Sequence, residues 1–241
     1  MLCRLDKFLG MTCHLTRQEA KTVIRKKLVL VDGTFATRPE QKIDTETQKI
    51  TYQGEELLYE EFVYYMLNKP AGVVSATKDN LHKTVLDILT SENVSGLFPV
   101  GRLDLDTEGL LLLTNDGELG HNLTSPAKHV SKQYEVLVEG ELTPEICETF
   151  QNGMDIGEKH LTRPSELIIL ESGAKSRALV TISEGKFHQV KRMFAHCGYS
   201  VLYLKRLKMG SLTLDENLAP GEYRRLTESE LAYLKEGKTD V

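Results

Sequence analysis

Tryptophan is absent from this 241-residue chain, and phenylalanine and tyrosine together supply only 7% of its residues. This scarcity of aromatic rings disfavours a glycosidase, the class to which paired carboxylates such as Asp104 and Asp106 would otherwise point. The four cysteines are scattered, with no CxxC pair and no histidine at metal-ligand spacing. We therefore expect neither a zinc site nor a disulfide framework, but reduced thiols of the kind found in the cytoplasm.

Long apolar stretches are also missing. No uninterrupted run reaches the length that a bilayer requires, and the first turns already carry Arg4, Asp6 and Lys7. The sequence thus predicts neither a transmembrane helix nor a signal peptide. It also lacks P-loop and dinucleotide-binding fingerprints, so we expect no metal and no other cofactor. We expect a cytoplasmic protein without a membrane partner.

Positive charge is in the minority, with 30 Lys and Arg against 35 Asp and Glu, so any surface for nucleic acid must be a local patch. The segment 1–30 reverses this balance, since only Asp6 and Glu19 oppose its cations. These cations are Arg4, Lys7, Arg17, Lys21, Arg25, Lys26 and Lys27. Arg17, Lys21 and Arg25 recur every four residues as a stripe on one helical face. Such a stripe is either an ordinary solvated face or a phosphate-binding surface.

Local signals predict a very small folded unit at the N-terminus. Apolar residues share one helical face across 5–9 and another across 20–24. Thr16, followed three residues later by Glu19, is a capping box, so the second helix should begin there. The pair Asp32-Gly33 separates two short apolar runs and is a strong hairpin signal, because both turn positions favour positive φ. The unit should therefore contain two helices and a hairpin.

The centre of the chain carries the string GRLDLDTEGLLLLTNDG at 101–117. Its four consecutive leucines, 110–113, are bounded by a glycine and by an Asn-Asp-Gly turn, which predicts a strand buried on both faces. Charged side chains crowd the residues just before this strand, namely Arg102, Asp104, Asp106 and Glu108. A single loop acid is usually a solvated turn residue. Three carboxylates beside one guanidinium, at the mouth of a buried strand, favour a functional site.

As a string, GRLDxxTxGLLLLTNDG resembles the active-site motif of the RsuA-like pseudouridine synthases, which isomerise uridine in ribosomal RNA. The match is long and dense, unlike a short pattern that recurs by chance. The resemblance implies that Asp104 is the catalytic residue, and Arg102 beside it offers positive charge for RNA. It also implies a reaction that breaks the N-glycosidic bond, turns the base in place and rejoins it through carbon, with no redox change.

A second motif lies in the segment 132–140, where Tyr134, Val136 and Val138 alternate with polar residues. This alternation predicts a half-buried strand. Taken alone, Tyr134 would be a core aromatic with its hydroxyl satisfied. The resemblance points elsewhere, because KxY matches the family's position for an active-site tyrosine that lies against the target base. Tyr134 is therefore expected to stack on a flipped-out uridine.

A third motif is EGKFHQVKRMF at 184–194. Apolar residues at i, i+3, i+4 and i+7 from Val190 predict a helix packed on a core, ending before Gly198. The string is similar to the family motif that supplies the basic partner of the catalytic aspartate. By position this partner is Lys191, with its neighbour Arg192 as the open alternative. The remaining expected RNA contacts of this motif are His188, Gln189 and Arg192.

The N-terminal pattern RLDKFL…TRxEAxxxI…VDG also resembles a small RNA-binding module first known from a ribosomal protein of the small subunit. We therefore expect an RNA-binding module at 1–56, a linker at 57–61 and a catalytic domain at 62–241, with Arg17, Lys21 and Arg25 on RNA. The catalytic region has many short strands and few strand-helix-strand alternations. This pattern predicts an α+β domain with a mixed, largely antiparallel sheet flanked by helices.

The substrate is suggested by resemblance alone. FHQVKRMFAHCG and LAPGEYRRLTESEL look more like the branch acting on small-subunit (16S) ribosomal RNA, which modifies one uridine, position 516 in the usual numbering. The expected partner is ribosomal RNA, free or in an assembly intermediate, and the protein is expected to be a monomer. Two alternatives remain, a large-subunit synthase of the same family and a non-catalytic assembly factor. The joint occurrence of Asp104, Tyr134 and Lys191 favours an enzyme, because a pure binder needs no carboxylate in its groove.

Overall fold

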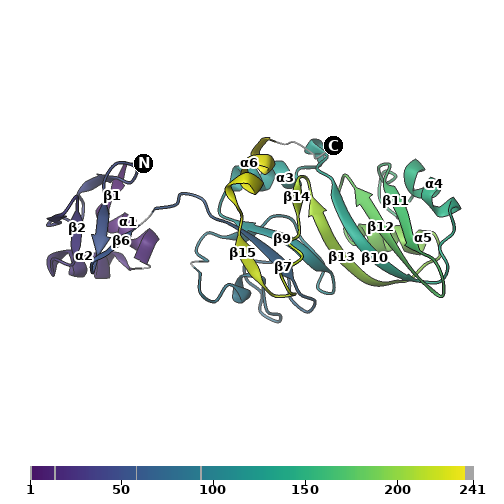
Figure 1. Cartoon of the computed structure of the whole chain (residues 1–241), viewed down its shortest axis with the longest axis horizontal. Helices are drawn as coiled ribbons and strands as arrows, with labels where there is room; N and C mark the ends of the chain where they lie inside the picture. Colours follow the sequence, from purple (N-terminus) through teal and green to yellow (C-terminus); the bar gives the residue numbers. More distant parts are fainter. Residues whose placement is uncertain (1, 14, 58, 93, 237–241) are drawn as a thin grey trace. The chain divides into compact units, whose positions relative to one another are not determined.

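The computed structural model describes residues 2–13, 15–57, 59–92 and 94–236. The chain divides into two compact units, Met1–Glu61 and Phe62–Val241 (Figure 1). Within the described residues, no helix is long and apolar enough to cross a membrane.

The N-terminal unit combines two helices with two small antiparallel sheets. One sheet pairs β1 with β4, and the other has the strand order β3-β2-β5-β6. The elements are β1 Leu2–Arg4, α1 Leu5–Cys13, α2 Arg17–Arg25, β2 Val29–Val31, β3 Thr34–Phe35, β4 Lys42–Asp44, β5 Ile50–Tyr52 and β6 Glu55–Leu57. Strand β6 reaches Leu57, which the sequence placed in the linker, and the Tyr59 ring packs near Phe8.

The local signals of this unit are confirmed. The backbone N–H of Glu19 donates to the Thr16 hydroxyl at 3.2 Å, and the Thr16 N–H donates to the Glu19 carboxylate at 2.8 Å. This capping box satisfies two of the free N–H groups at the start of α2. Asp32 and Gly33, with φ of 50° and 77°, form the tight turn between β2 and β3. Both elements form where short-range hydrogen bonding and backbone preference agree.

A nine-stranded sheet forms the second unit. Its order is β11-β12-β10-β13-β9-β7-β15, with β14 added on β13 and β8 on β9 (Figure 1). Among the described strands of this sheet, only β13 and β9 pair in parallel, which confirms the predicted mixed, largely antiparallel sheet. The strands are β7 Tyr64–Lys69, β8 Phe98–Pro99, β9 Glu108–Thr114, β10 Lys132–Glu139, β11 Glu166–Glu171, β12 Lys175–Ile182, β13 Val201–Met209, β14 Leu212–Thr213 and β15 Tyr223–Arg225.

Strand β9 lies inside the sheet, between β13 and β7. Its leucines 110–113 are fully buried, as predicted, and alternate ones pack into separate cores on the two faces. Gly109 has a φ of 99°, and a Cβ atom there would lie 2.3 Å from the Arg206 carbonyl oxygen. Only glycine therefore lets β9 approach β13 this closely. This contact brings the start of β9 beside the centre of β13.

Helices cover both faces of the sheet. One core includes Phe150 of α4 and Phe194 of α5, whose ring centroids lie 5.0 Å apart. The other core includes leucines of α3 and α6. Asp116 caps α3 by accepting from the Leu119 N–H at 3.0 Å, and its second oxygen accepts from the Tyr64 hydroxyl at 2.8 Å. The helical elements are η1 Leu86–Ile88, α3 Gly117–Thr124, η2 Pro126–Lys128, α4 Glu145–Asn152, α5 Gln189–His196 and α6 Glu228–Glu236.

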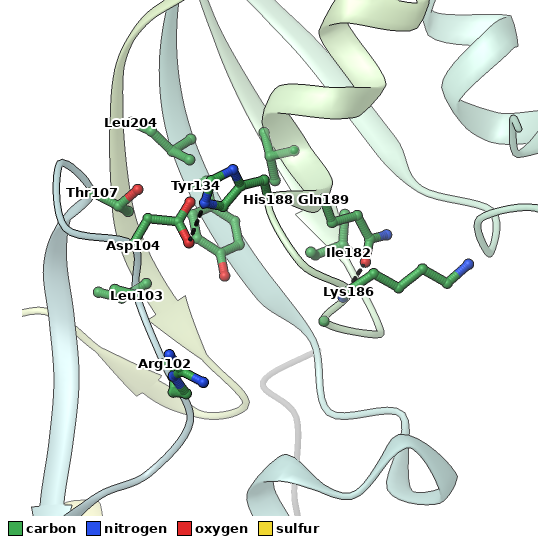
Figure 2. Close-up of a pocket in the computed structure, with 12 residues that line it drawn as sticks. Arg102, Leu103, Asp104, Thr107, Tyr134, Ile182, Lys186, His188, Gln189 and Leu204 are labelled. Carbon is green, nitrogen blue, oxygen red and sulfur yellow. Dashed lines mark hydrogen bonds and ion pairs between the residues drawn. The ribbon is translucent and has the colours of Figure 1, made fainter. Parts of the chain in front are cut away.

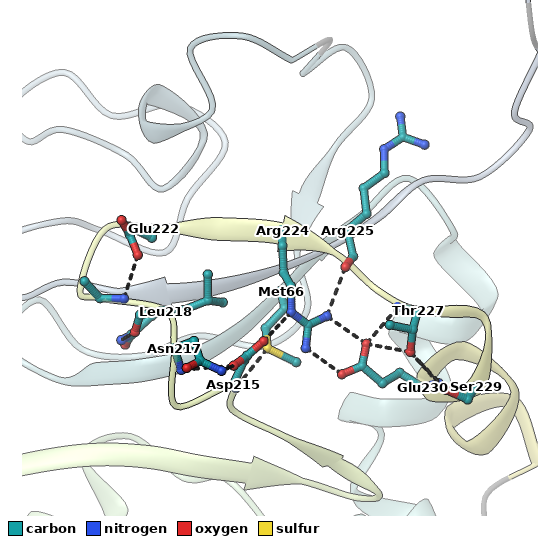
Figure 3. A network of polar contacts seen from close by, with 12 residues as sticks. Met66, Asp215, Asn217, Leu218, Glu222, Arg224, Arg225, Thr227, Ser229 and Glu230 are labelled. Carbon is teal, nitrogen blue, oxygen red and sulfur yellow. Dashed lines mark hydrogen bonds and ion pairs between the residues drawn. The ribbon is translucent and has the colours of Figure 1, made fainter.

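An ion-pair network fastens α6 to the sheet (Figure 3). Arg224 of β15 donates to Asp215 at 2.7 Å and to both carboxylate oxygens of Glu230 at 2.8 Å. These hydrogen bonds raise the pKa of Arg224 and lower the pKa of Asp215 and of Glu230. Glu230 also accepts from the Thr227 N–H at 2.8 Å, and the Glu230 N–H donates to the Thr227 hydroxyl at 3.2 Å, so these two residues form a capping box at the start of α6.

Two elements of the second unit are very short. The 3₁₀ helix η1 is a single turn, and the Asp87 carboxylate accepts from the Thr84 N–H and hydroxyl at its start. Strand β8 is limited to Phe98–Pro99, since proline has no N–H to donate to a neighbouring strand.

Candidate active site

Asp104 lies in the loop 101–107 that connects β8 to β9. Lys69, at the end of β7, fixes the backbone of this loop, because its Nζ donates to the carbonyls of Asp104 at 3.0 Å and Thr107 at 2.8 Å. The same ammonium donates to the Pro70 carbonyl at 3.0 Å. Lys69 is fully buried, and this burial lowers its pKa to about 8 against the opposing effect of Asp106 and other nearby acids. No pattern in the sequence had assigned this lysine a role.

The residues that follow β7 complete this support of the loop. The Gly72 N–H donates to the Leu105 carbonyl at 2.8 Å. The Ser75 hydroxyl accepts from the Leu103 N–H and donates to its carbonyl, both at 3.0 Å. The backbone on both sides of Asp104 is thus tied to a neighbouring segment. Such support from a second layer of contacts holds a functional side chain in a defined position.

Two basic side chains approach the Asp104 carboxylate. His188 Nε2 lies 3.6 Å from Oδ1, and Lys191 Nζ lies 3.5 Å from Oδ2. Figure 2 shows the imidazole of His188 and the carboxylate of Asp104 facing each other. The carboxylate is 27% exposed, so it is partly screened from solvent but still open on one side. This arrangement can hold an anionic carboxylate in position while leaving it accessible to a ligand.

Lys191 is shared between two carboxylates. Its ammonium donates to Asp106 at 2.5 Å, a shorter contact than the one with Asp104. This hydrogen bond is the main cause of the lowered pKa of Asp106. Asp106 is 71% exposed, whereas Asp104 is only 27% exposed. Of the two candidates predicted from the sequence, the structure places Lys191 beside Asp104.

The guanidinium of Arg192 points elsewhere. It donates to the Glu158 carboxylate at 2.7 Å and to the Phe187 carbonyl at 3.0 Å, and it also contacts the Ile156 carbonyl. Gln189 is likewise occupied, since it is buried, donates to Glu184 at 2.8 Å and accepts from a backbone N–H. In the structure Gln189 thus binds the loop 184–188, and Arg192 joins this loop to the segment 156–158.

A hollow of about 600 Å³ opens beside Asp104 and is called the Asp104 pocket below. It is bounded by the loop 101–105, the start of β10, the loop 184–188 and the middle of β13. Its polar or aromatic lining residues include Ser75, Arg102, Asp104, Lys132, Tyr134, Lys186, His188 and Arg206. Arg102, for which the sequence predicted an RNA contact, is exposed at this wall.

Tyr134 belongs both to the core and to the Asp104 pocket. It is 8% exposed and packs with Val136 and Val138 of β10, and its ring also lines the hollow. Asp104 and His188 line the same pocket, and in the view of Figure 2 the Tyr134 ring is seen behind them. Burial from behind fixes the ring, and its open side can receive a planar ligand.

Phe187 is a feature that sequence reasoning did not single out. It lines the Asp104 pocket, is 74% exposed and stacks on His188 with ring centroids 3.8 Å apart. His188 itself has a φ of 48°, a rare backbone conformation for a residue other than glycine. The signal in the sequence that could have pointed to Phe187 is an apolar ring within the polar start of the third motif. An exposed ring of this kind suits stacking on a nucleobase.

The predicted basic stripe of the N-terminal unit lies on α2. Arg17 and Arg25 are exposed and Lys21 is half-buried. Within the described residues, none of the three forms an ion pair with a carboxylate within 4.0 Å. Their charges therefore remain available for phosphate groups.

Comparison with known proteins identifies the chain. A family model described as RNA pseudouridylate synthase matches residues 63–196, and an S4 domain model matches residues 3–48. A Bacillus subtilis protein named uncharacterized RNA pseudouridine synthase YtzG is 46% identical over 97% of this chain and 98% of its own length. The ribosomal small subunit pseudouridine synthase A of Escherichia coli K12 is 42% identical over 95% of this chain and 98% of its own length.

A solved structure is also similar over nearly the whole chain. A crystal structure of a pseudouridylate synthase matches with a TM-score of 0.69 and 40% identity, and covers 96% of this chain and 99% of that chain. The family model, the relatives that are similar over nearly the full length and the solved structure all indicate the same family. The protein therefore belongs to the RNA pseudouridylate synthase family and is an RNA pseudouridine synthase with an N-terminal S4 domain.

Proposed function

We propose that this synthase isomerises a single uridine of small-subunit ribosomal RNA, with Asp104 as the catalytic carboxylate. The observation that carries the proposal is the position of Asp104, which lies beside two basic side chains and lines one pocket together with Tyr134. Relatives named ribosomal small subunit pseudouridine synthase A, at 41% and 42% identity over nearly the full chain, support the choice of RNA.

Isomerisation of uridine to pseudouridine needs an ionised carboxylate near the ribose and the base. Such a group acts as a nucleophile or as a general base at the sugar. The Lys191 ammonium at 3.5 Å attracts the Asp104 carboxylate and orients it. Lys69 fixes the backbone of the same residue through the Asp104 carbonyl. The carboxylate is thus held from two sides while one side stays open to the substrate.

The uridine has to leave its stack before Asp104 can reach it. Base flipping costs a few kcal/mol, which aromatic stacking and contacts to phosphates offset. Tyr134 offers the ring inside the pocket, and Phe187 offers an exposed ring at its edge. Arg102 at the wall supplies positive charge for the RNA backbone. Each of these groups lies on the same hollow as Asp104.

The N-terminal unit supplies affinity for the phosphate groups of RNA. Arg17, Lys21 and Arg25 present a basic stripe on α2 within an otherwise acidic chain. Cations of this kind bind phosphates by releasing condensed counterions, a contribution that does not depend on base sequence. The module therefore increases the time that the protein spends on RNA, and the Asp104 pocket selects the nucleotide.

The test is to delete the gene and map pseudouridine across both ribosomal RNAs by chemical labelling and primer extension. The expected result is loss of one small-subunit site, restored by the parental protein but not by Asp104→Asn. Loss at a large-subunit site would contradict the substrate and spare the chemistry. If no site is lost, the protein does not modify ribosomal RNA in the cell, and the proposal fails.

A further inference from the structure

Two cations on the wall of the Asp104 pocket take no part in the chemistry described above. Lys132 begins β10 and Arg206 lies in β13, and their side chains are only 9% and 3% exposed. Both line the hollow in which Asp104 and Tyr134 meet. Within the described part of the chain, neither cation forms an ion pair with a carboxylate. A buried cation without a counter-charge is costly, so its presence calls for an explanation.

Their hydrogen bonds leave donors unused. Lys132 Nζ donates to the Val130 carbonyl at 2.8 Å, and Arg206 Nε donates to the Leu110 carbonyl at 2.8 Å. Arg206 Nη2 is buried and has no hydrogen-bond partner. Lys69 shows how this protein satisfies a structural lysine, since three carbonyls surround its ammonium within 3.0 Å. Lys132 and Arg206 are not satisfied in this way.

The two cations lie close to each other and to Tyr134. Arg206 is the direct cross-strand neighbour of Tyr134 in the pairing of β10 with β13. Lys132 and Tyr134 are two residues apart on the same face of β10, which places them roughly 7 Å apart along the strand. The pKa of Lys132 is lowered to about 8 by burial and by the charge of Arg206. An anion bound between the two cations would offset both the burial of Lys132 and its repulsion by Arg206.

We propose that Lys132 and Arg206 form a phosphate subsite, which binds a phosphodiester next to the uridine stacked on Tyr134. The two side chains together offer several unused N–H donors and two positive charges on the wall of the pocket that Tyr134 also lines. Charge-assisted hydrogen bonds to phosphate are among the strong ones, and a guanidinium suits a phosphate in particular. The inference deepens the proposed function and rests on it only in taking the substrate RNA as the ligand.

The experiment uses a short fragment of the RNA that the parental protein modifies. A single methylphosphonate, which carries no charge, replaces each phosphodiester flanking the target uridine in turn. Dissociation constants and single-turnover rates are measured for the parental protein and for Lys132→Met. We expect one of the two replacements to weaken binding to the parental protein about tenfold, the size of one hydrogen bond to a charged group. Lys132→Met should bind the unmodified RNA more weakly than the parental protein, and the same replacement should change its dissociation constant only a little.

Two controls separate this role from a structural one. Lys208→Met removes an exposed lysine of the same strand as Arg206, and it should keep the full methylphosphonate effect. Lys132→Met should unfold at the parental temperature or above it, because it removes a poorly solvated charge. Arg206→Lys keeps the positive charge of the second cation and tests whether its guanidinium group is needed.

The outcomes of the two proposals are distinguishable. If the parental protein and Lys132→Met show equal methylphosphonate effects, or if Lys132→Met is less stable but binds RNA normally, the phosphate subsite is wrong. If the parental protein isomerises a large-subunit fragment instead, the proposed substrate is wrong, while the phosphate subsite is tested on that fragment in the same way.

Discussion

The N-terminal unit and the Asp104 pocket both use positive charge, but under opposite conditions of solvation. On α2, Arg17 and Arg25 are exposed and their charges are solvated. In the pocket, Lys132 and Arg206 are almost completely buried. Solvated charges act over about a Debye length and are weakened by salt, whereas desolvated charges act only on a group in contact with them. The first kind suits attraction of any RNA, and the second kind suits the placing of one nucleotide.

The largest expected effect comes from the carboxylate in the pocket. Asp104→Asn removes a charge but little volume, so isomerisation should fall by about 10⁴-fold or more, as when other enzymes lose a reacting group. Single-turnover conversion of substrate RNA measures this rate. RNA affinity and the unfolding temperature should stay near the parental values. Isomerisation at the parental rate would show that another residue carries the chemistry.

The next effect concerns the solvated charges of α2. Replacing Arg17, Lys21 and Arg25 by Gln should weaken RNA binding and lower the slope of log affinity against log salt by roughly two to three, about one for each lost phosphate contact. Dissociation constants measured over a range of salt concentrations give this slope. The rate at saturating RNA should not change, because the pocket is untouched. An unchanged slope would mean that the stripe is only a solvated face.

A smaller effect is expected in the pH dependence of stability. The pKa of Lys132 is about 8 in the folded protein and near 10.5 when unfolded, so between these values the unfolded chain binds more protons. The stability of the parental protein at this site therefore rises from pH 8 to 10.5. Lys132→Met should be more stable than the parent at pH 7 by roughly 1 to 3 kcal/mol.

The advantage of Lys132→Met should shrink as the pH rises through this window. Denaturant unfolding of both proteins at pH 7, 8.5 and 10 measures the difference. A constant difference across the series would show that Lys132 is not charged and buried at neutral pH.

The smallest effect is expected for the second carboxylate bound to Lys191. Asp106 is 71% exposed, and exposed ion pairs are worth about 0–1 kcal/mol. Asp106→Asn should therefore change the single-turnover rate by less than about fivefold, although it removes the shorter of the two contacts of Lys191. A loss as large as that of Asp104→Asn would mean that Asp106 shares the chemistry.

Features that depend on neighbours along the chain were predictable. The capping box Thr16–Glu19, the alternation of β10 and the buried leucines of β9 all occur where the sequence predicted them. Each depends on side chains within a few residues of one another, so spacing alone specifies it. The family motifs also pointed to Asp104, Tyr134 and Lys191, which the structure brings to one site.

The sequence by itself determined local elements, such as the capped helix α2 and the buried strand β9, and the membership of this family. Only the tertiary structure decided what surrounds each charge. Lys69 holds the loop of Asp104 because β7 pairs with β9, and Lys132 meets Arg206 because β10 pairs with β13. These partners lie 35 and more residues apart in the chain. Solvation and ion pairing depend on which distant segments meet, and no local spacing of residues contains that information.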